Sequence, residues 1–121
     1  MGAEDPSRII FTSGATEAIQ MAVFSVLESA KKAKSDDFGG RDLILYGSTE
    51  HKAVPQAIGH WTRTLGMPVQ IEALPVDARG QVRLDVLREK LPRTLLLCTM
   101  AVNNETGVIQ DIAAIEALLR E

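Results

Sequence analysis

Three short polar clusters in this 121-residue chain carry side chains of the kinds that bind small ligands, at residues 12–16, 47–51 and 103–107. In the second cluster, the imidazole of His51 can stack on a flat heterocycle or move a proton. In the third, the amides of Asn103 and Asn104 can donate hydrogen bonds to a phenolate or a carboxylate, although Asn and Gly also favour a plain turn. These residue types suit contacts with a small organic ligand.

The first cluster precedes an amphipathic helix. Apolar residues recur at helical spacing over residues 18–30, so a helix is expected to begin near Ala15 or Thr16. The first N–H groups of a helix have no intrahelical partner and lie at the positive end of its dipole, so they can hold a phosphate. Gly14 would let the backbone approach that anion closely, and Thr16 can add a hydroxyl donor. The alternative is an ordinary helix start capped by Ser13 or Thr16.

Other catalytic arrangements lack the residues that they need. His51 and His60 do not have the i, i+4 spacing of a metal-binding pair, and Cys98 stands alone in an apolar run, so we expect no metal site. We expect His60 on a helix surface and Cys98 as a buried, inert thiol. The hydrolase elbow Gly-x-Ser-x-Gly, the dinucleotide motif Gly-x-Gly-x-x-Gly and the Walker Gly-Lys pair do not occur in the sequence.

The elements that must position these clusters alternate between strand and helix patterns, which predicts an α/β fold with a mostly parallel sheet. Strands are predicted at 8–11, 42–46, 69–74 and 94–100, and helices at 15–30, 52–65, 84–91 and 111–121. Residues 35–40 are predicted to form a mobile surface loop, and the very hydrophobic run 94–100 to be the central strand. Because such sheets bind ligands at the carboxyl ends of their strands, the three clusters should converge on one composite site.

Composition limits the partners of the chain. With 45% hydrophobic and 24% charged residues, the chain suits one domain with a core. A formal net charge of -3 and scattered basic residues predict no nucleic-acid partner. One cysteine cannot form an internal disulfide, residues 1–6 lack the basic region and apolar region of a signal peptide, and no apolar run approaches the ~20 residues of a membrane span. We therefore expect a cytoplasmic protein with no membrane partner.

Three segments, at residues 8–17, 49–54 and 102–112, carry a family resemblance. Together and in this order they resemble the cysteine desulfurases, which belong to the class V aminotransferase group of pyridoxal-phosphate enzymes. The likeness starts at Ala3 and covers nearly the whole chain, with residues 35–40 as its least matched part. It implies a partial doubly wound, mostly parallel sheet with flanking helices, and residues 1–121 as one partial cofactor-binding domain from the front of the large domain.

The resemblance also implies roles for individual residues. The residues that match Ala15 and Thr16 bind the cofactor phosphate. The residue that matches His51 stacks on the pyridine ring and assists proton transfer, and the one that matches Asn104 lies at the cofactor and substrate side. The implied reaction removes sulfur from L-cysteine, an amino-acid substrate. It leaves alanine and a protein-bound persulfide, whose sulfur goes to an acceptor protein for iron–sulfur cluster or thiocofactor assembly.

Parts of the family's machinery lie outside these residues. In the family, the aspartate that pairs with the pyridine nitrogen, the Schiff-base lysine and the persulfide cysteine come later in a longer chain. Lys52 follows Thr-Glu-His, as in the motif of that lysine, but residues 53–56 match the ring-stacking segment instead, so we expect Lys52 to be an exposed first-turn lysine. Cys98 does not match the mobile nucleophile. We expect a truncated segment that is inactive alone and cannot hold pyridoxal phosphate covalently through the family lysine.

A partial sheet leaves an apolar edge strand, which favours pairing with another chain, so we expect a homo-oligomer. Two alternatives stay open. One is a segment of a selenocysteine lyase or another class V aminotransferase, which would share the three segments. The other is a noncatalytic α/β binding or assembly module that is recruited through its exposed edge.

Overall fold

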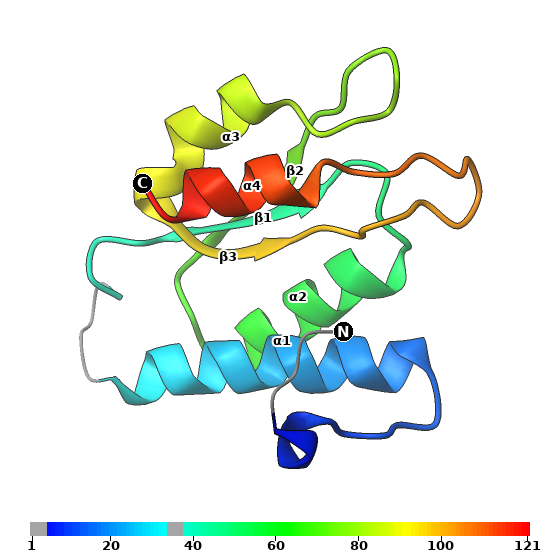
Figure 1. Cartoon of the computed structure of the whole chain (residues 1–121). Coiled ribbons are helices and arrows are strands. Elements are labelled where there is room, and N and C mark those ends of the chain that lie inside the picture. Colours follow the sequence, from blue (N-terminus) through cyan, green and yellow to red (C-terminus); the bar gives the residue numbers. More distant parts are fainter. Residues whose placement is uncertain (1–4, 34–37) are drawn as a thin grey trace.

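A parallel three-stranded sheet lies at the centre of this computed structural model, which describes residues 5–33 and 38–121 (Figure 1). Its strands are β1 (Leu43–Gly47), β2 (Gln70–Leu74) and β3 (Thr94–Cys98), in the order β2-β1-β3. The expectation that the run 94–100 is central is therefore wrong. β1 is paired on both edges, whereas β3 pairs only with β1 among the described strands, and its residues after Thr94 stay half-exposed. High hydropathy alone therefore does not fix the position of a strand in the sheet.

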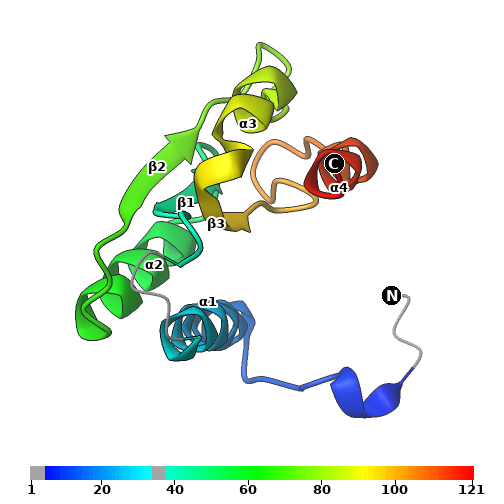
Figure 2. The ribbon, with the colours of Figure 1, turned by 90° about the vertical axis from the view of Figure 1, so that its left-hand side faces the viewer.

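Helices cover both faces of the sheet, as Figure 2 shows. One face carries α1 (Ala15–Lys32) and α2 (Ala53–Thr64), and the other carries α3 (Leu84–Lys90) and α4 (Ile112–Leu119). Successive side chains of a strand point to opposite faces, so Ile44 packs in the core with α1 and α2, whereas Leu43 and Leu45 pack in the core with α3 and α4. The predicted partial doubly wound α/β fold is confirmed.

The ends of these helices follow from local chemistry. Asp111 Oδ1 accepts the N–H of Ala114 at 2.9 Å and caps the start of α4. Beyond α2, Gly66 adopts a φ of 63°, which a residue without a Cβ reaches at little cost, and the chain turns toward β2. A short 3-10 helix, Leu91–Arg93, connects α3 to β3. The helices predicted at 52–65 and 111–121 are confirmed to within three residues at each end.

The apolar run at residues 8–11 does not form the predicted buried strand. A 3-10 helix, Pro6–Arg8, is followed by irregular backbone, and Phe11 is 94% exposed. Figure 2 shows this segment leading away from the sheet before α1 begins. A strand needs a neighbour for its N–H and C=O groups, and no described strand lies beside this run. Its apolar composition alone therefore does not make it a strand.

The predicted loop at 35–40 lies partly outside the described residues. Residues 35–37 are not described, and Phe38 to Gly40 form a turn in which all three residues have positive φ values, between 48° and 78°. This turn leads the chain into β1. The predicted mobility of the loop stays a prediction.

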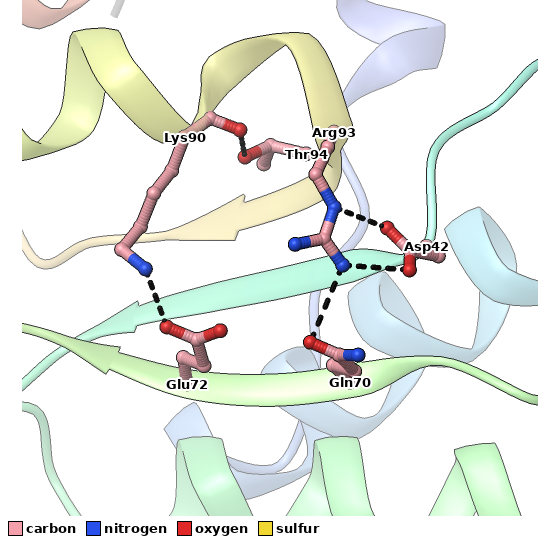
Figure 3. Close-up of polar contacts among 6 residues, drawn as sticks. All are labelled: Asp42, Gln70, Glu72, Lys90, Arg93 and Thr94. Atoms are coloured by element: carbon pink, nitrogen blue, oxygen red, sulfur yellow. Dashed lines mark hydrogen bonds and ion pairs between the residues drawn. The ribbon is translucent and has the colours of Figure 1, made fainter.

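Polar side chains join the amino-terminal ends of the three strands (Figure 3). The guanidinium of Arg93 donates to both carboxylate oxygens of Asp42 at 2.8 and 2.7 Å, and to the Gln70 side-chain oxygen at 3.3 Å. The ammonium of Lys90 contacts the Glu72 carboxylate at 2.6 Å. Because Asp42, Gln70 and Arg93 stand at or next to the starts of three different strands, their contacts hold the strand register at the end opposite the predicted ligand site.

Arg93→Ala is expected to lower stability in a pH-dependent way. Hydrogen bonds from Arg93 hold the pKa of the Asp42 carboxyl below its ordinary value. Because the folded pKa is the lower one, the stabilisation is present above the unfolded pKa of about 3.9 and is lost as the pH falls through the folded pKa. Urea midpoints of the variant and the unmodified chain should therefore differ at neutral pH and converge as the pH falls through the folded pKa of Asp42. A difference between the two urea midpoints that does not change with pH would contradict this account.

Candidate functional site

The turn that follows β1 forms the first wall of the site. It closes through a hydrogen bond from the Glu50 N–H to the Gly47 carbonyl at 3.0 Å, and it delivers His51 to the start of α2. His51 is exposed, and its Nδ1 accepts the N–H of Ala53 at 3.2 Å. An imidazole that accepts at Nδ1 carries its proton on Nε2 when neutral. The turn therefore orients the ring and leaves Nε2–H as a donor.

The loop between β3 and α4, residues 99–110, forms the second wall. The side-chain oxygen of Asn103 accepts the N–H groups of Glu105 and Thr106, both at 2.9 Å. Gly107, with a φ of 74°, reverses the chain and donates its N–H to the Asn103 carbonyl at 2.9 Å. This tight turn buries Asn103 and leaves its neighbour Asn104 exposed at the tip.

The two walls enclose one pocket of about 260 Å³, lined by Thr49, Glu50, His51, Asn103, Asn104, Glu105 and Thr106. Its size is just below the roughly 300–1,000 Å³ of typical small-molecule pockets. The structure thus brings together the second and third polar clusters, and with them His51 and Asn104. Imidazole, amide and hydroxyl groups at one opening can contact a polar, flat ligand. The roles predicted for His51 and Asn104 stay predictions.

The first cluster lies at the same end of the molecule but outside this pocket. Figure 1 shows the start of α1 at the right-hand end, where the loops after β1 and β3 also lie. Ala15 and Thr16 are the first two residues of α1; both are exposed, and neither lines the pocket. Their predicted contact with a phosphate therefore stays a prediction.

Neither Ser13 nor Thr16 caps α1, so the predicted cap residues are wrong. Gly14 holds the cap position in an extended conformation, without a side-chain cap. Ser13 instead donates its N–H and its hydroxyl to the Glu17 carboxylate at 2.6 and 2.7 Å, because the glutamate side chain reaches back over the first turn. These bonds lower the pKa of the Glu17 carboxyl. The first N–H groups of the helix are left without a capping side chain.

Two of the remaining singled-out residues differ from their predicted places: Cys98 is only half-buried, and Lys52, although exposed as predicted, precedes the first turn of α2. Burial first, and the Glu50 charge second, raise the pKa of the Cys98 thiol to about 11, so it is protonated at neutral pH and a poor nucleophile. His60 is exposed on α2, with its ring edge-on to Trp61 at 4.7 Å between centroids. Lys52 is exposed directly before α2. Residues 5–33 and 38–121 contain no group of three His, Cys, Asp or Glu residues placed to hold a metal ion.

A family model described as aminotransferase class-V matches residues 1–121. The chain belongs to the class V aminotransferases. This family depends on pyridoxal phosphate. The mitochondrial cysteine desulfurase of Candida maltosa is 40% identical over 118 residues, which are 97% of this chain and 22% of that protein. The resemblance to cysteine desulfurases that the three segments predict is confirmed.

Solved structures agree with this class V assignment. A NifS-like protein is 32% identical with a TM-score of 0.79, over 96% of this chain and 29% of that one. DndA from Streptomyces lividans is 35% identical with a TM-score of 0.77, over 96% of this chain and 30% of that one. The class V chain thus spans less than a third of these relatives. Within the described residues, no helix combines the length and apolar character that a membrane crossing needs.

The sequence-based interpretation of this class V chain missed Gln110, a buried residue that anchors the second wall. Only 5% of Gln110 is exposed. Its side-chain oxygen accepts the Val82 N–H at 2.8 Å, and its Nε2 donates to the Gly80 carbonyl at 2.9 Å. The carboxyl-terminal end of the 99–110 loop is thereby fixed to the hairpin at 76–82. A single amide after the apolar pair Val108-Ile109 was the available signal.

Proposed function

We propose that this chain, residues 1–121, is the partial cofactor-binding domain of a cysteine desulfurase. The observation that carries the proposal is the pocket in which His51 and Asn104 meet, at the carboxyl ends of a parallel sheet. Open α/β sheets bind their ligands at that edge. The similarity to named cysteine desulfurases over 97% of the chain supports the same reading.

The residues present fit pyridoxal phosphate. His51 is held through Nδ1, so its ring is free to lie against the pyridine and its Nε2–H to hold or move a proton. Asn104 can donate from its exposed amide to an oxygen of the ring or of the substrate. The uncapped N–H groups of α1, at Ala15 and Thr16, suit the phosphate. The bound cofactor supplies an electron sink; the protein supplies position and electrostatics.

No lysine is among the residues that line the described pocket. The chain by itself therefore holds pyridoxal phosphate without a covalent bond and does not turn over cysteine. In the whole protein, the reaction removes sulfur from L-cysteine and gives alanine and a persulfide for a sulfur-acceptor protein. Steady sulfide release from cysteine by this chain and pyridoxal phosphate would refute the proposed inactivity.

A titration with pyridoxal phosphate, followed by its absorbance, tests the site. Saturable binding is expected, and it should be weaker for pyridoxal, which lacks the phosphate. A chain that leaves the absorbance unchanged up to millimolar cofactor would refute the cofactor site. In that case a noncatalytic binding or assembly role would account better for the exposed edge of β3.

Gly14→Ala separates phosphate binding from folding. A Cβ on Gly14 would meet nothing within 4 Å, and its φ of 170° is open to any residue. The free energy of unfolding should change by about 1 kcal/mol or less, because only the cap residue differs. A methyl group would nevertheless stand where the phosphate approaches the backbone, so affinity for pyridoxal phosphate should fall about tenfold. Pyridoxal affinity should not change, and equal affinities of both proteins for pyridoxal phosphate would remove α1 from the site.

We also propose that two copies of the chain associate through β3. Among the described strands, β3 pairs only with β1, so one of its edges is open. Two hollows of about 440 Å³ each lie along β3 and α4, and Leu97 and Leu119 line both. Leu119 is 54% exposed. Open edges and apolar surface favour pairing with another chain. A clean monomer in light scattering at high concentration would contradict association.

A further inference from the structure

We infer that Glu50 and Asn103 are positioning residues that lock the loop carrying His51 to the loop carrying Asn104. The inference depends on the proposed function only for the identity of the ligand that the two loops would bind. The lock itself is a property of the chain without ligand. It can therefore be tested separately from cofactor binding.

The lock consists of two crossed hydrogen bonds between the loops. From the first loop, Glu50 Oε1 accepts the N–H of Met100 at 2.5 Å. From the second, Asn103 Nδ2 donates to the Thr49 carbonyl at 2.9 Å. Each loop thus sends one side chain to the backbone of the other. Two separate bonds in opposite directions restrict both sliding and rotation between the loops.

The locked residues adjoin the site residues directly. Glu50 precedes His51, and Asn103 precedes Asn104. Asn103 is 6% exposed, and its other side-chain atom, Oδ1, already holds the turn at Glu105 and Thr106. One buried amide therefore shapes the second loop with its oxygen and ties it to the first loop with its nitrogen. Glu50 and Asn103 also line the pocket themselves, so loss of either bond acts on the pocket directly.

The environment of Glu50 disfavours the charged form of its carboxylate. It is half-buried, and burial raises the pKa of its carboxyl above the ordinary value. The thiol of Cys98 on β3 lies close enough to sense its charge. Gly47 leaves the space for it, because a Cβ there would stand 3.1 Å from Glu50 Oε1. Withdrawing a carboxylate from water for one backbone N–H is a weak way to gain stability, which favours a positioning role.

Three variants and a control test the lock in the ligand-free chain. Glu50→Ala removes the bond to Met100, and Glu50→Gln keeps an acceptor oxygen in the same place. Asn103→Asp keeps the acceptor for the turn but removes the donor to Thr49. Glu89→Ala, on an exposed residue of α3, is the matched control. The readouts are amide hydrogen exchange by NMR, the His51 imidazole signals, and the urea midpoint.

Glu50→Ala should speed exchange of the Met100 amide about tenfold or more, as expected for one lost hydrogen bond to a charged group. The His51 signals should shift or broaden in Glu50→Ala and in Asn103→Asp. In Asn103→Asp the Glu105 and Thr106 amides should keep their protection. Glu50→Gln and Glu89→Ala should match the unmodified chain within about twofold, because neither removes the crossed bonds.

Several outcomes would overturn the lock. One is a Met100 amide that exchanges freely in the unmodified chain, a result that needs no variant to fold. Another is an unchanged His51 signal in both Glu50→Ala and Asn103→Asp. A third is a Met100 amide that exchanges as fast in Glu50→Gln as in Glu50→Ala. That result would mean that the charge of Glu50, and not its hydrogen bond to Met100, protects the amide. If the loops uncouple as expected but the unmodified chain binds no pyridoxal phosphate, the lock stands and the proposed function fails.

Discussion

His51→Ala is expected to weaken binding of pyridoxal phosphate about ten- to a hundredfold, the range expected for loss of a ring that stacks on a flat heterocycle. Folding should change little. The His51 ring is exposed, and the hydrogen bond that it accepts from Ala53 is long, at 3.2 Å. Absorbance titration gives the affinity, and the urea midpoint gives the stability.

Two further variants test whether the loss of affinity in His51→Ala is specific to the ring at this position. His60→Ala removes the second histidine, which is also exposed on α2 but contacts Trp61, and it should leave the affinity unchanged. His51→Phe keeps an aromatic face without Nε2–H, so it should retain most of the binding. Equal losses in His51→Ala and His60→Ala would show that the ring has no specific role. A loss in His51→Phe as large as in His51→Ala would replace stacking by hydrogen bonding as the cause.

Gln110→Ala is expected to cause the largest loss of stability. Both polar atoms of this buried side chain are bonded, to the Val82 N–H and the Gly80 carbonyl. A buried group that loses its partner costs about 1–3 kcal/mol, so two such groups should cost about 2–6 kcal/mol. That is a large share of the roughly 5–15 kcal/mol that stabilises a typical domain. Urea unfolding measures the loss.

Gln81→Ala is the matched control for Gln110. Gln81 also joins the 76–82 hairpin to the 99–110 loop, through a bond from Nε2 to the Ile109 carbonyl at 3.2 Å. This contact is exposed, so water can replace it, and the loss should stay below about 1 kcal/mol. Similar losses in the two variants would show that burial of the amide is not what makes Gln110 important.

Much of the fold could be predicted because helices and buried strands depend on local periodicity. The stripe of apolar residues in 52–65 predicts α2, and the aspartate at 111 marks the start of α4, both without information from the rest of the chain. The strand order could not be predicted in this way. The run 94–100 is the most apolar, yet β1 is central, because pairing on both edges depends on which neighbours the chain folds against. The same reason leaves residues 9–11 without a strand.

By itself, the sequence determined the alternation of elements, the family, and the polar clusters that hold His51 and Asn104. The sequence also predicted that these clusters meet, but only the tertiary structure showed that Ala15 and Thr16 lie outside the pocket that the other two clusters line. It alone also showed the bonds from Glu50 to Met100 and from Asn103 to Thr49. Local patterns record how a residue relates to its near neighbours in the chain. Contacts across about fifty residues depend on how the sheet and its loops pack in space.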